Sequence, residues 1–309
     1  MYHQQRIGYW SQLAILLALI GGSMIIGALI TGFVIKAMTG VPLTEIANVL
    51  KDPRYVDAAR VAQGLGAFLT FGVPALVFAA IVDRKPVAYL GFNERARPLQ
   101  FIYVAGIMFL ALFVGAGLSQ LNELIPISKG LADKFKKLEQ EYNEQVVAIA
   151  TMKNFKDYIY TLITIALIPA VVEELIFRCS LQQVMIGLTK NVFLGILITS
   201  ILFSAIHISF YGFLTRMFLG LLLGYIFYYS KNAWLNVFAH FFNNAFVVTN
   251  MYFLSRTQKI DTHSMEDHYP WYMAIISGLL LLYLMTLFHR ESNKLAPATI
   301  AGTDVPNAF

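Results

Sequence analysis

The sequence has few charged residues and almost no cysteine, and each shortage excludes a class of protein. Only 13% of its 309 residues are charged, whereas soluble domains carry about 25%. The single cysteine, Cys179, excludes an internal disulfide framework. The net charge of +5 is modest. We assign it to loop lysines and arginines near lipid headgroups, not to a nucleic-acid surface.

Apolar residues dominate the chain instead. They make up 58% of it, and the mean hydropathy is +0.63. A membrane-spanning helix needs about 20 predominantly apolar residues, and the sequence contains several runs of that length. We therefore predict an all-α, polytopic membrane protein with about eight transmembrane helices, at residues 11–37, 61–82, 99–121, 158–178, 192–208, 213–229, 233–254 and 270–288.

Segment 125–155 differs from these runs because its apolar residues recur at helical spacing between charged ones. Leu131, Phe135, Leu138 and Tyr142 are 4, 3 and 4 residues apart. This pattern predicts an amphipathic helix outside the hydrocarbon, acting as a connector, with substrate gating as the alternative. We divide the chain into three spans plus this helix (1–157), a core that carries the polar residues described below (158–254), and a last span with the tail (255–309).

The fourth predicted span contains an acidic pair, Glu173 and Glu174. Each charge at the bilayer centre costs roughly 2.5–3.5 kcal/mol on insertion scales. Neighbouring helical residues point about 100° apart, and Arg178 lies four residues after Glu174, on the same face. We therefore predict that Arg178 holds Glu174 and that Glu173 is free to act. An ion pair that only fixes helix packing is the alternative.

Three further polar residues lie on later spans. His207 is near the end of the fifth, and His240 and Asn244 share one face of the seventh. Each has a plainer explanation, either an interfacial histidine or helix–helix hydrogen bonding. Together with Glu173 they provide what peptide hydrolysis requires. A glutamate and a histidine activate water, and N–H groups of histidine and asparagine donate to the developing oxyanion.

The same residues leave the question of a metal open. One glutamate and two histidines could supply three zinc ligands and leave a position for water. The sequence has no His-Glu-x-x-His and no cysteine-rich spacing, but spacing alone does not separate the two mechanisms. A serine mechanism is less well supported, because no Gly-x-Ser-x-Gly occurs.

These polar positions resemble, in the same order, the three motifs of the CAAX-protease and bacteriocin-processing family of intramembrane endopeptidases (CPBP or Abi family). Glu-Glu-x-x-x-Arg occupies residues 173–178, Phe-x-x-x-His runs from Phe203 to His207, and His-x-x-x-Asn runs from His240 to Asn244. One such motif is weak, but three on successive apolar spans are specific. The resemblance covers residues 158–250.

The resemblance implies an eight-helix membrane hydrolase for intramembrane proteolysis, with its site in a cavity open to the cytoplasmic side. It implies that Glu173 and His207 activate water, that His240 and Asn244 hold the oxyanion, and that Glu174 and Arg178 support them. We expect no cofactor, with zinc as the alternative. We expect a multi-pass protein of the bacterial inner (cell) membrane, whose partners are the bilayer and a peptide or protein substrate, lipidated or not, but no nucleic acid.

Two other functions stay open at this point. A non-catalytic binding, immunity or scaffold protein on the same fold would keep its function in a Glu173→Gln variant, because shape survives while the base is lost. An ion-coupled transporter with carboxylates at the midplane often shows internal repeats, and the acidic motif occurs only once.

Overall fold

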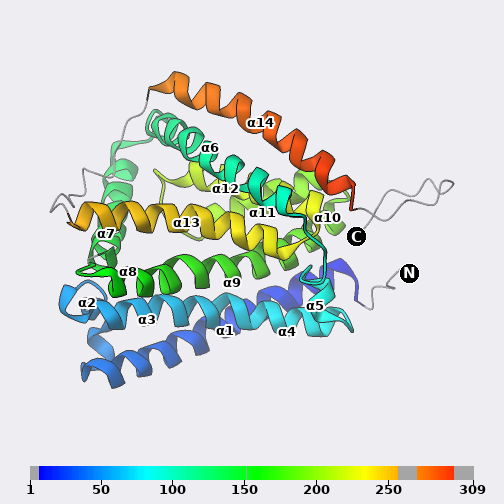
Figure 1. Ribbon diagram of the computed structural model, residues 1–309. Coiled ribbons are helices and arrows are strands. Elements are labelled where there is room, and N and C mark those ends of the chain that lie inside the picture. The colour runs from blue at the N-terminus through cyan, green and yellow to red at the C-terminus, as the bar shows by residue number, and fades with distance from the viewer. Residues whose placement is uncertain (1–6, 151, 257–269, 296–309) are drawn as a thin grey trace.

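The computed structural model describes residues 7–150, 152–256 and 270–295, and every regular element within these ranges is a helix. The long helices run side by side, and helix α7 lies across one end of the bundle (Figure 1). The start of α1 and the end of α14 both lie at the opposite end of the bundle (Figure 1). The all-α membrane fold is confirmed. Within the described ranges, six helical segments are long and apolar enough to cross a membrane, so the count of eight stays a prediction.

Most predicted spans match single helices. These are α1 (Tyr9–Thr39), α6 (Pro98–Glu123), α11 (Val192–Ala205), α12 (Phe213–Ser230), α13 (Ala233–Arg256) and α14 (Trp271–Asn293). The amphipathic segment forms α7 (Lys129–Ala150). The short connecting elements are η1 (Leu43–Glu45), α2 (Ile46–Val49), η2 (Pro53–Tyr55) and α5 (Pro86–Tyr89). Most of the predicted loop 255–269 and the tail beyond residue 295 lie outside the described residues, and no observation tests the division into three parts.

Two spans are interrupted by wider, π-helical stretches. The second span consists of α3 (Val56–Ala67), η3 (Phe68–Gly72) and α4 (Val73–Val82). The fourth consists of α8 (Phe155–Thr161), η4 (Leu162–Leu167), α9 (Ile168–Ile176), η5 (Phe177–Gln182) and α10 (Gln183–Thr189). Pro74 and Pro169 follow η3 and η4, and neither has an N–H for the carbonyl four residues back, which favours local widening.

The predicted end of the fourth span at Arg178 is wrong, because the helix continues to Thr189. Residues 174–182 are instead all buried. The charges of Glu174 and Arg178 neutralise each other inside the bundle, so the helix does not have to end there.

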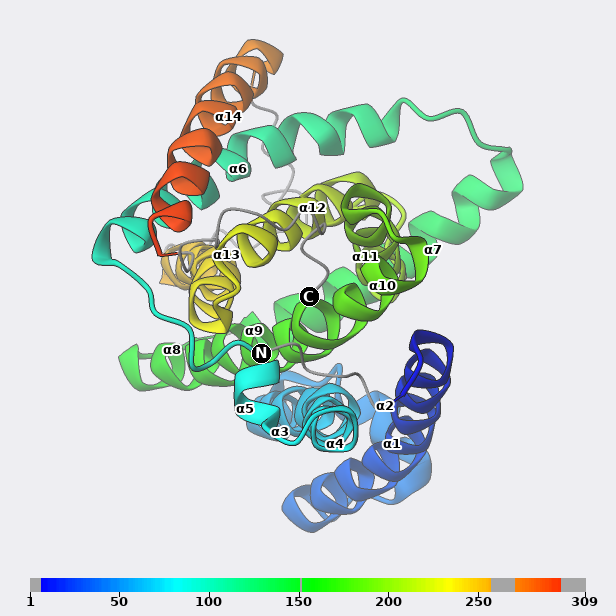
Figure 2. The same ribbon diagram turned by 90° about the vertical axis from the view of Figure 1, so that its right-hand side faces the viewer.

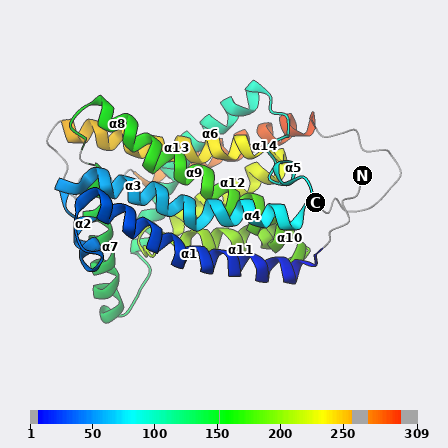
Figure 3. The same cartoon turned by 90° about the horizontal axis from the view of Figure 1, so that it is seen from below.

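Helix α9, which carries the acidic pair, lies in the middle of the bundle. Viewed along the helices, α1 and α14 lie on the outside, while α9 lies between α3–α4 and α13 (Figure 2). α1 packs along α3 and α4 (Figure 3). Gly220 and Gly224 of α12 let α11 approach closely: an added Cβ would lie 2.8 Å from Ser200 Cβ and 2.5 Å from Ile196 Cγ2, respectively.

The start of α13 is held by a turn at Gly91. Gly91 has a φ of +82°, and its carbonyl accepts a hydrogen bond of 3.1 Å from the Ala233 N–H. Asn232 caps α13 through the Leu235 N–H and donates to the Glu94 carbonyl. This turn therefore fixes where α13 enters the bundle, and α13 carries His240.

We expect Gly91→Ala to destabilise the protein. An added Cβ would lie 2.5 Å from the Lys231 carbonyl oxygen, and a left-handed backbone costs a non-glycine residue about 1–2 kcal/mol before that clash is counted. Denaturant unfolding in detergent should show a loss of at least this size. Gly21→Ala on α1 is the control, because nothing lies within 4 Å of its added Cβ. Equal stability of the two variants would contradict the expectation.

Candidate active site

The buried ion pair between Glu174 and Arg178 forms the base of the site. Arg178 Nη1 donates a hydrogen bond of 2.8 Å to Glu174 Oε1, and both residues have 0% exposure. The pairing predicted from their i, i+4 spacing is therefore present. Because both charges have left water, their mutual neutralisation is a condition for burying either of them.

Glu174 also joins α9 to α13. His240 Nδ1 lies 2.8 Å from Glu174 Oε1, and Asn236 Nδ2 donates to Oε2 at 2.9 Å. Asn236 Nδ2 further donates to the Leu223 carbonyl of α12 at 2.8 Å. A carboxylate paired with arginine only accepts hydrogen bonds, so Nδ1 of His240 carries a proton. Glu174 thereby fixes both the tautomer and the orientation of the His240 ring.

Glu173 lies on the other side of the same ring. Its Oε2 is 3.8 Å from His240 Nε2, and its side chain keeps 13% exposure, against 0% for Glu174. Each ring nitrogen of His240 therefore faces one member of the acidic pair. Of these two carboxylates, Glu173 is the one with exposed surface, and its role as the free glutamate stays a prediction.

Phe203 lies between His207 and the His240 ring and contacts both. His207 Nδ1 lies 2.8 Å from the Phe203 carbonyl oxygen, and the Phe203 ring centroid is 5.1 Å from the His207 ring and 5.9 Å from the His240 ring. The Arg178 guanidinium lies 4.3 Å from the same centroid. The phenylalanine of Phe-x-x-x-His thus packs against residues of all three motifs, and this accounts for an aromatic residue at that position.

Asn244 lies one helical turn after His240 and is partly buried. Its Oδ1 accepts a hydrogen bond of 3.4 Å from Asn243. In the described part of the chain, no hydrogen bond joins Asn244 to either glutamate. The structure therefore places Asn244 on the same helix face as His240, and its contact with a reacting group stays a prediction.

Sequence reasoning missed two residues of this region, Asn236 and Arg216. Asn236 lies one turn before His240, so the face predicted from His240 and Asn244 extends by one more polar residue. Arg216 is a charged residue in the first turns of the apolar helix α12, and its guanidinium lies over Gly212, in the turn that follows His207. Isolated polar residues in a span usually face a partner, and this signal was present in the sequence for both.

The choice between a metal-free site and a zinc site stays a prediction. Of the described residues, no group of three or more histidine, cysteine, aspartate or glutamate side chains is arranged to hold a metal ion. Glu174 already occupies Nδ1 of His240, which leaves Nε2, 3.8 Å from Glu173 Oε2, as the ring nitrogen that could bind a metal in the zinc alternative.

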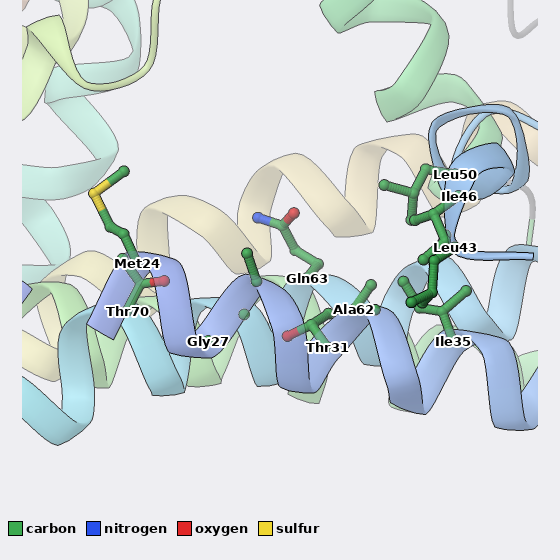
Figure 4. Close-up of a pocket in the computed structure, with 14 residues that line it drawn as sticks. Met24, Gly27, Thr31, Ile35, Leu43, Ile46, Leu50, Ala62, Gln63 and Thr70 are labelled. Atoms are coloured by element: carbon green, nitrogen blue, oxygen red, sulfur yellow. The ribbon is translucent and has the colours of Figure 1, made fainter. Parts of the chain in front are cut away.

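A cavity of about 540 Å³ lies elsewhere, between α1 and α3 beneath η1 and α2 (Figure 4). Its wall is mostly apolar, with polar groups at Thr31, Gln63 and Thr70, and it includes none of the site residues. The cavity expected around the acidic pair, open to the cytoplasmic side, therefore stays a prediction.

A comparison with protein families gives one match. The family model described as Type II CAAX prenyl endopeptidase, Rce1-like, matches residues 155–246. This segment runs from the start of α8 into α13 and includes Glu173, Glu174, Arg178, His207, His240 and Asn244. It covers less than a third of the chain. Neither curated proteins nor solved structures gave a match.

Proposed function

Since residues 155–246 belong to the Rce1-like family of Type II CAAX prenyl endopeptidases, we propose that this membrane protein hydrolyses a peptide bond with water activated by Glu173 and His207. One observation carries the proposal. Glu173 keeps 13% side-chain exposure, and its Oε2 lies 3.8 Å from Nε2 of His240, while Nδ1 of that ring lies 2.8 Å from Glu174 of the buried ion pair. That arrangement resembles a base beside a fixed proton donor, which is what peptide hydrolysis needs.

The proposed reaction begins with proton transfer from water to the Glu173 carboxylate, while His207 orients the water. The resulting hydroxide attacks the carbonyl carbon, and negative charge develops on the carbonyl oxygen. Glu173 then returns its proton to the leaving amine as the carbon–nitrogen bond breaks. Protons balance over the cycle, and Glu173 ends as it began.

His240 and Asn244 donate to the oxyanion in this proposal. His240 Nδ1–H donates a hydrogen bond to Glu174. Nε2 can therefore donate to the oxyanion only when the ring carries a proton on both nitrogens. The two ring nitrogens face carboxylate oxygens at 2.8 Å and 3.8 Å. Removal of one oxyanion donor typically lowers kcat by about 10²–10³-fold.

The test is a cleavage assay in liposomes. We propose a prenylated substrate that ends in Cys-aliphatic-aliphatic-X, as the family description suggests. The purified protein is reconstituted with an internally quenched farnesylated peptide of this kind, and an unprenylated peptide of the same sequence serves as the comparison. Cleavage of the farnesylated peptide alone supports the full proposal. Cleavage of both supports a peptidase without prenyl specificity, and cleavage of neither overturns the proposed function for this substrate class.

We expect this activity to survive metal removal. The proposed proton transfers involve only side chains of the chain, and the described donor set does not form a metal cluster. Dialysis against a chelator should therefore leave kcat unchanged within about twofold. A loss of turnover that added zinc restores, and that magnesium does not, would contradict the metal-free mechanism.

A further inference from the structure

The turn that carries His207 has a strained backbone. It connects α11 to α12 at residues 206–212, and Ile208 within it has a φ of +50°. A β-branched residue rarely adopts this left-handed conformation, and such strain persists only when surrounding contacts impose it. Ile208 itself is 71% exposed, so its own side chain supplies little of that constraint. Other contacts must hold the turn.

One side of the turn is held by α6. Asn122, which is 1% exposed, donates from Nδ2 to the Phe210 carbonyl at 2.8 Å. Its Oδ1 accepts from the Leu214 N–H at 3.2 Å. These two bonds fix the second half of the turn and the first residues of α12.

The other side is held by the amphipathic helix α7. The Ser209 hydroxyl donates to Glu139 Oε2 at 2.8 Å and accepts from the Gly212 N–H at 3.2 Å. The Phe135 ring stacks on Phe210, with centroids 4.7 Å apart and planes 3° from parallel. Phe135 and Glu139 are four residues apart, so one face of α7 contacts consecutive residues of the turn.

We propose that Phe135 and Glu139 are positioning residues for His207, so that the site is complete only when this face of α7 is docked on the turn. The proposal rests on the proposed function and deepens it. His207 directly precedes the strained Ile208. If the turn relaxes to an ordinary φ, the His207 backbone moves with it, and a displacement of about 1 Å can cost 10²-fold in rate.

The first experiment measures peptide cleavage by Glu139→Ala, Glu139→Gln and the control Asp133→Ala. Asp133 is an exposed acid on the same helix, so its removal changes the charge of α7 without touching the turn. We expect Glu139→Ala to lower kcat about 10- to 100-fold with KM within about twofold. Glu139→Gln should keep most of the activity, because its amide oxygen still accepts from Ser209. Equal kcat for Glu139→Ala and Asp133→Ala would overturn the proposal.

A second substitution tests whether α7 is needed because it holds the strained turn beside His207, and not for some other reason. Asparagine tolerates the left-handed conformation better than isoleucine, so Ile208→Asn should hold the turn with less help. We expect Ile208→Asn to restore at least a few-fold of the kcat lost in Glu139→Ala. A double variant no more active than Glu139→Ala would argue against strain at Ile208 as the reason that α7 is needed.

Hydrogen exchange of backbone amides tests the same inference without a substrate. In Glu139→Ala, backbone amides of residues 207–213 should exchange faster than in the unmodified protein, whereas Asp133→Ala should leave them unchanged. If the peptide is not cleaved at all, the proposed function fails. The exchange rates at residues 207–213 still test whether Glu139 of α7 holds the turn. Unchanged exchange at 207–213 in Glu139→Ala would overturn the role of α7 even in an active enzyme.

Discussion

Glu173→Gln is expected to lower kcat for peptide cleavage by about 10²–10⁴-fold, the range that a positioned general base contributes. The amide keeps the size of the side chain but cannot take a proton from water. The fold should survive, because Glu173 is not one of the groups that satisfy Arg178, Asn236 or His240 Nδ1. Thermal unfolding close to that of the unmodified protein should accompany the loss of turnover.

The matched control for this substitution is Glu123→Gln. Glu123 is an exposed carboxylate at the end of α6, so its replacement makes the same chemical change outside the site, and kcat should stay within about twofold. Turnover by Glu173→Gln equal to that of the control would remove Glu173 as the base. If Glu173→Gln lost cleavage but kept its function in cells, the protein would act there as a non-catalytic binding or scaffold protein.

The acidic doublet shows why adjacent, identical residues receive different roles. Glu174 accepts from three side chains and is fully buried, so a substrate water would have to displace one of its partners. Glu173 is turned to the side of His240 Nε2 and keeps some exposure. A helix places adjacent residues about 100° apart, and this alone is enough to put one carboxylate in the packing interior and the other at the site.

Some of this arrangement could be predicted because it follows local rules. The pairing of Glu174 with Arg178 depends only on the spacing of four residues along one helix. The hydrogen bond between Glu174 and His240 joins residues 66 apart in the sequence. It therefore depends on how α9 and α13 pack, and the hydrophobic pattern of the sequence does not predict that packing. The motif order placed both residues in one site, but only the structure shows which carboxylate holds the ring.

Two errors concern charged residues inside spans. The fourth span was expected to end at Arg178, and Arg216 was not among the predicted site residues. The helix continues past Arg178, which is neutralised by Glu174, and the Arg216 guanidinium lies over Gly212 in the turn after His207. A charge inside a span is tolerated where an opposite charge faces it. Such a partner is visible in the sequence only when it lies on the same helix, as for Arg178.

Arg178→Met is expected to destabilise the protein by about 3–5 kcal/mol, the usual result of removing one partner of a buried ion pair. The Glu174 carboxylate would then stay in the core without the guanidinium, held by its hydrogen bonds with Asn236 and His240. Arg178→Lys is the matched control. Arg178 reaches Glu174 through one nitrogen, Nη1, and an ammonium group supplies one donor and the same charge. Denaturant unfolding in detergent should rank Arg178→Lys well above Arg178→Met.

The double variant Glu174→Gln/Arg178→Met decides whether the orphaned charge is the cause. It removes both charges and keeps a side-chain oxygen near His240 Nδ1, so it should be more stable than Arg178→Met alone, although it contains one more substitution. If the double variant were as unstable as Arg178→Met, the loss would come from the packing of Arg178 on Phe203 and not from the uncompensated carboxylate. In that case Glu174 would not need Arg178 to remain ionised, and the fixed orientation of His240 would rest on Asn236 and Glu174 alone.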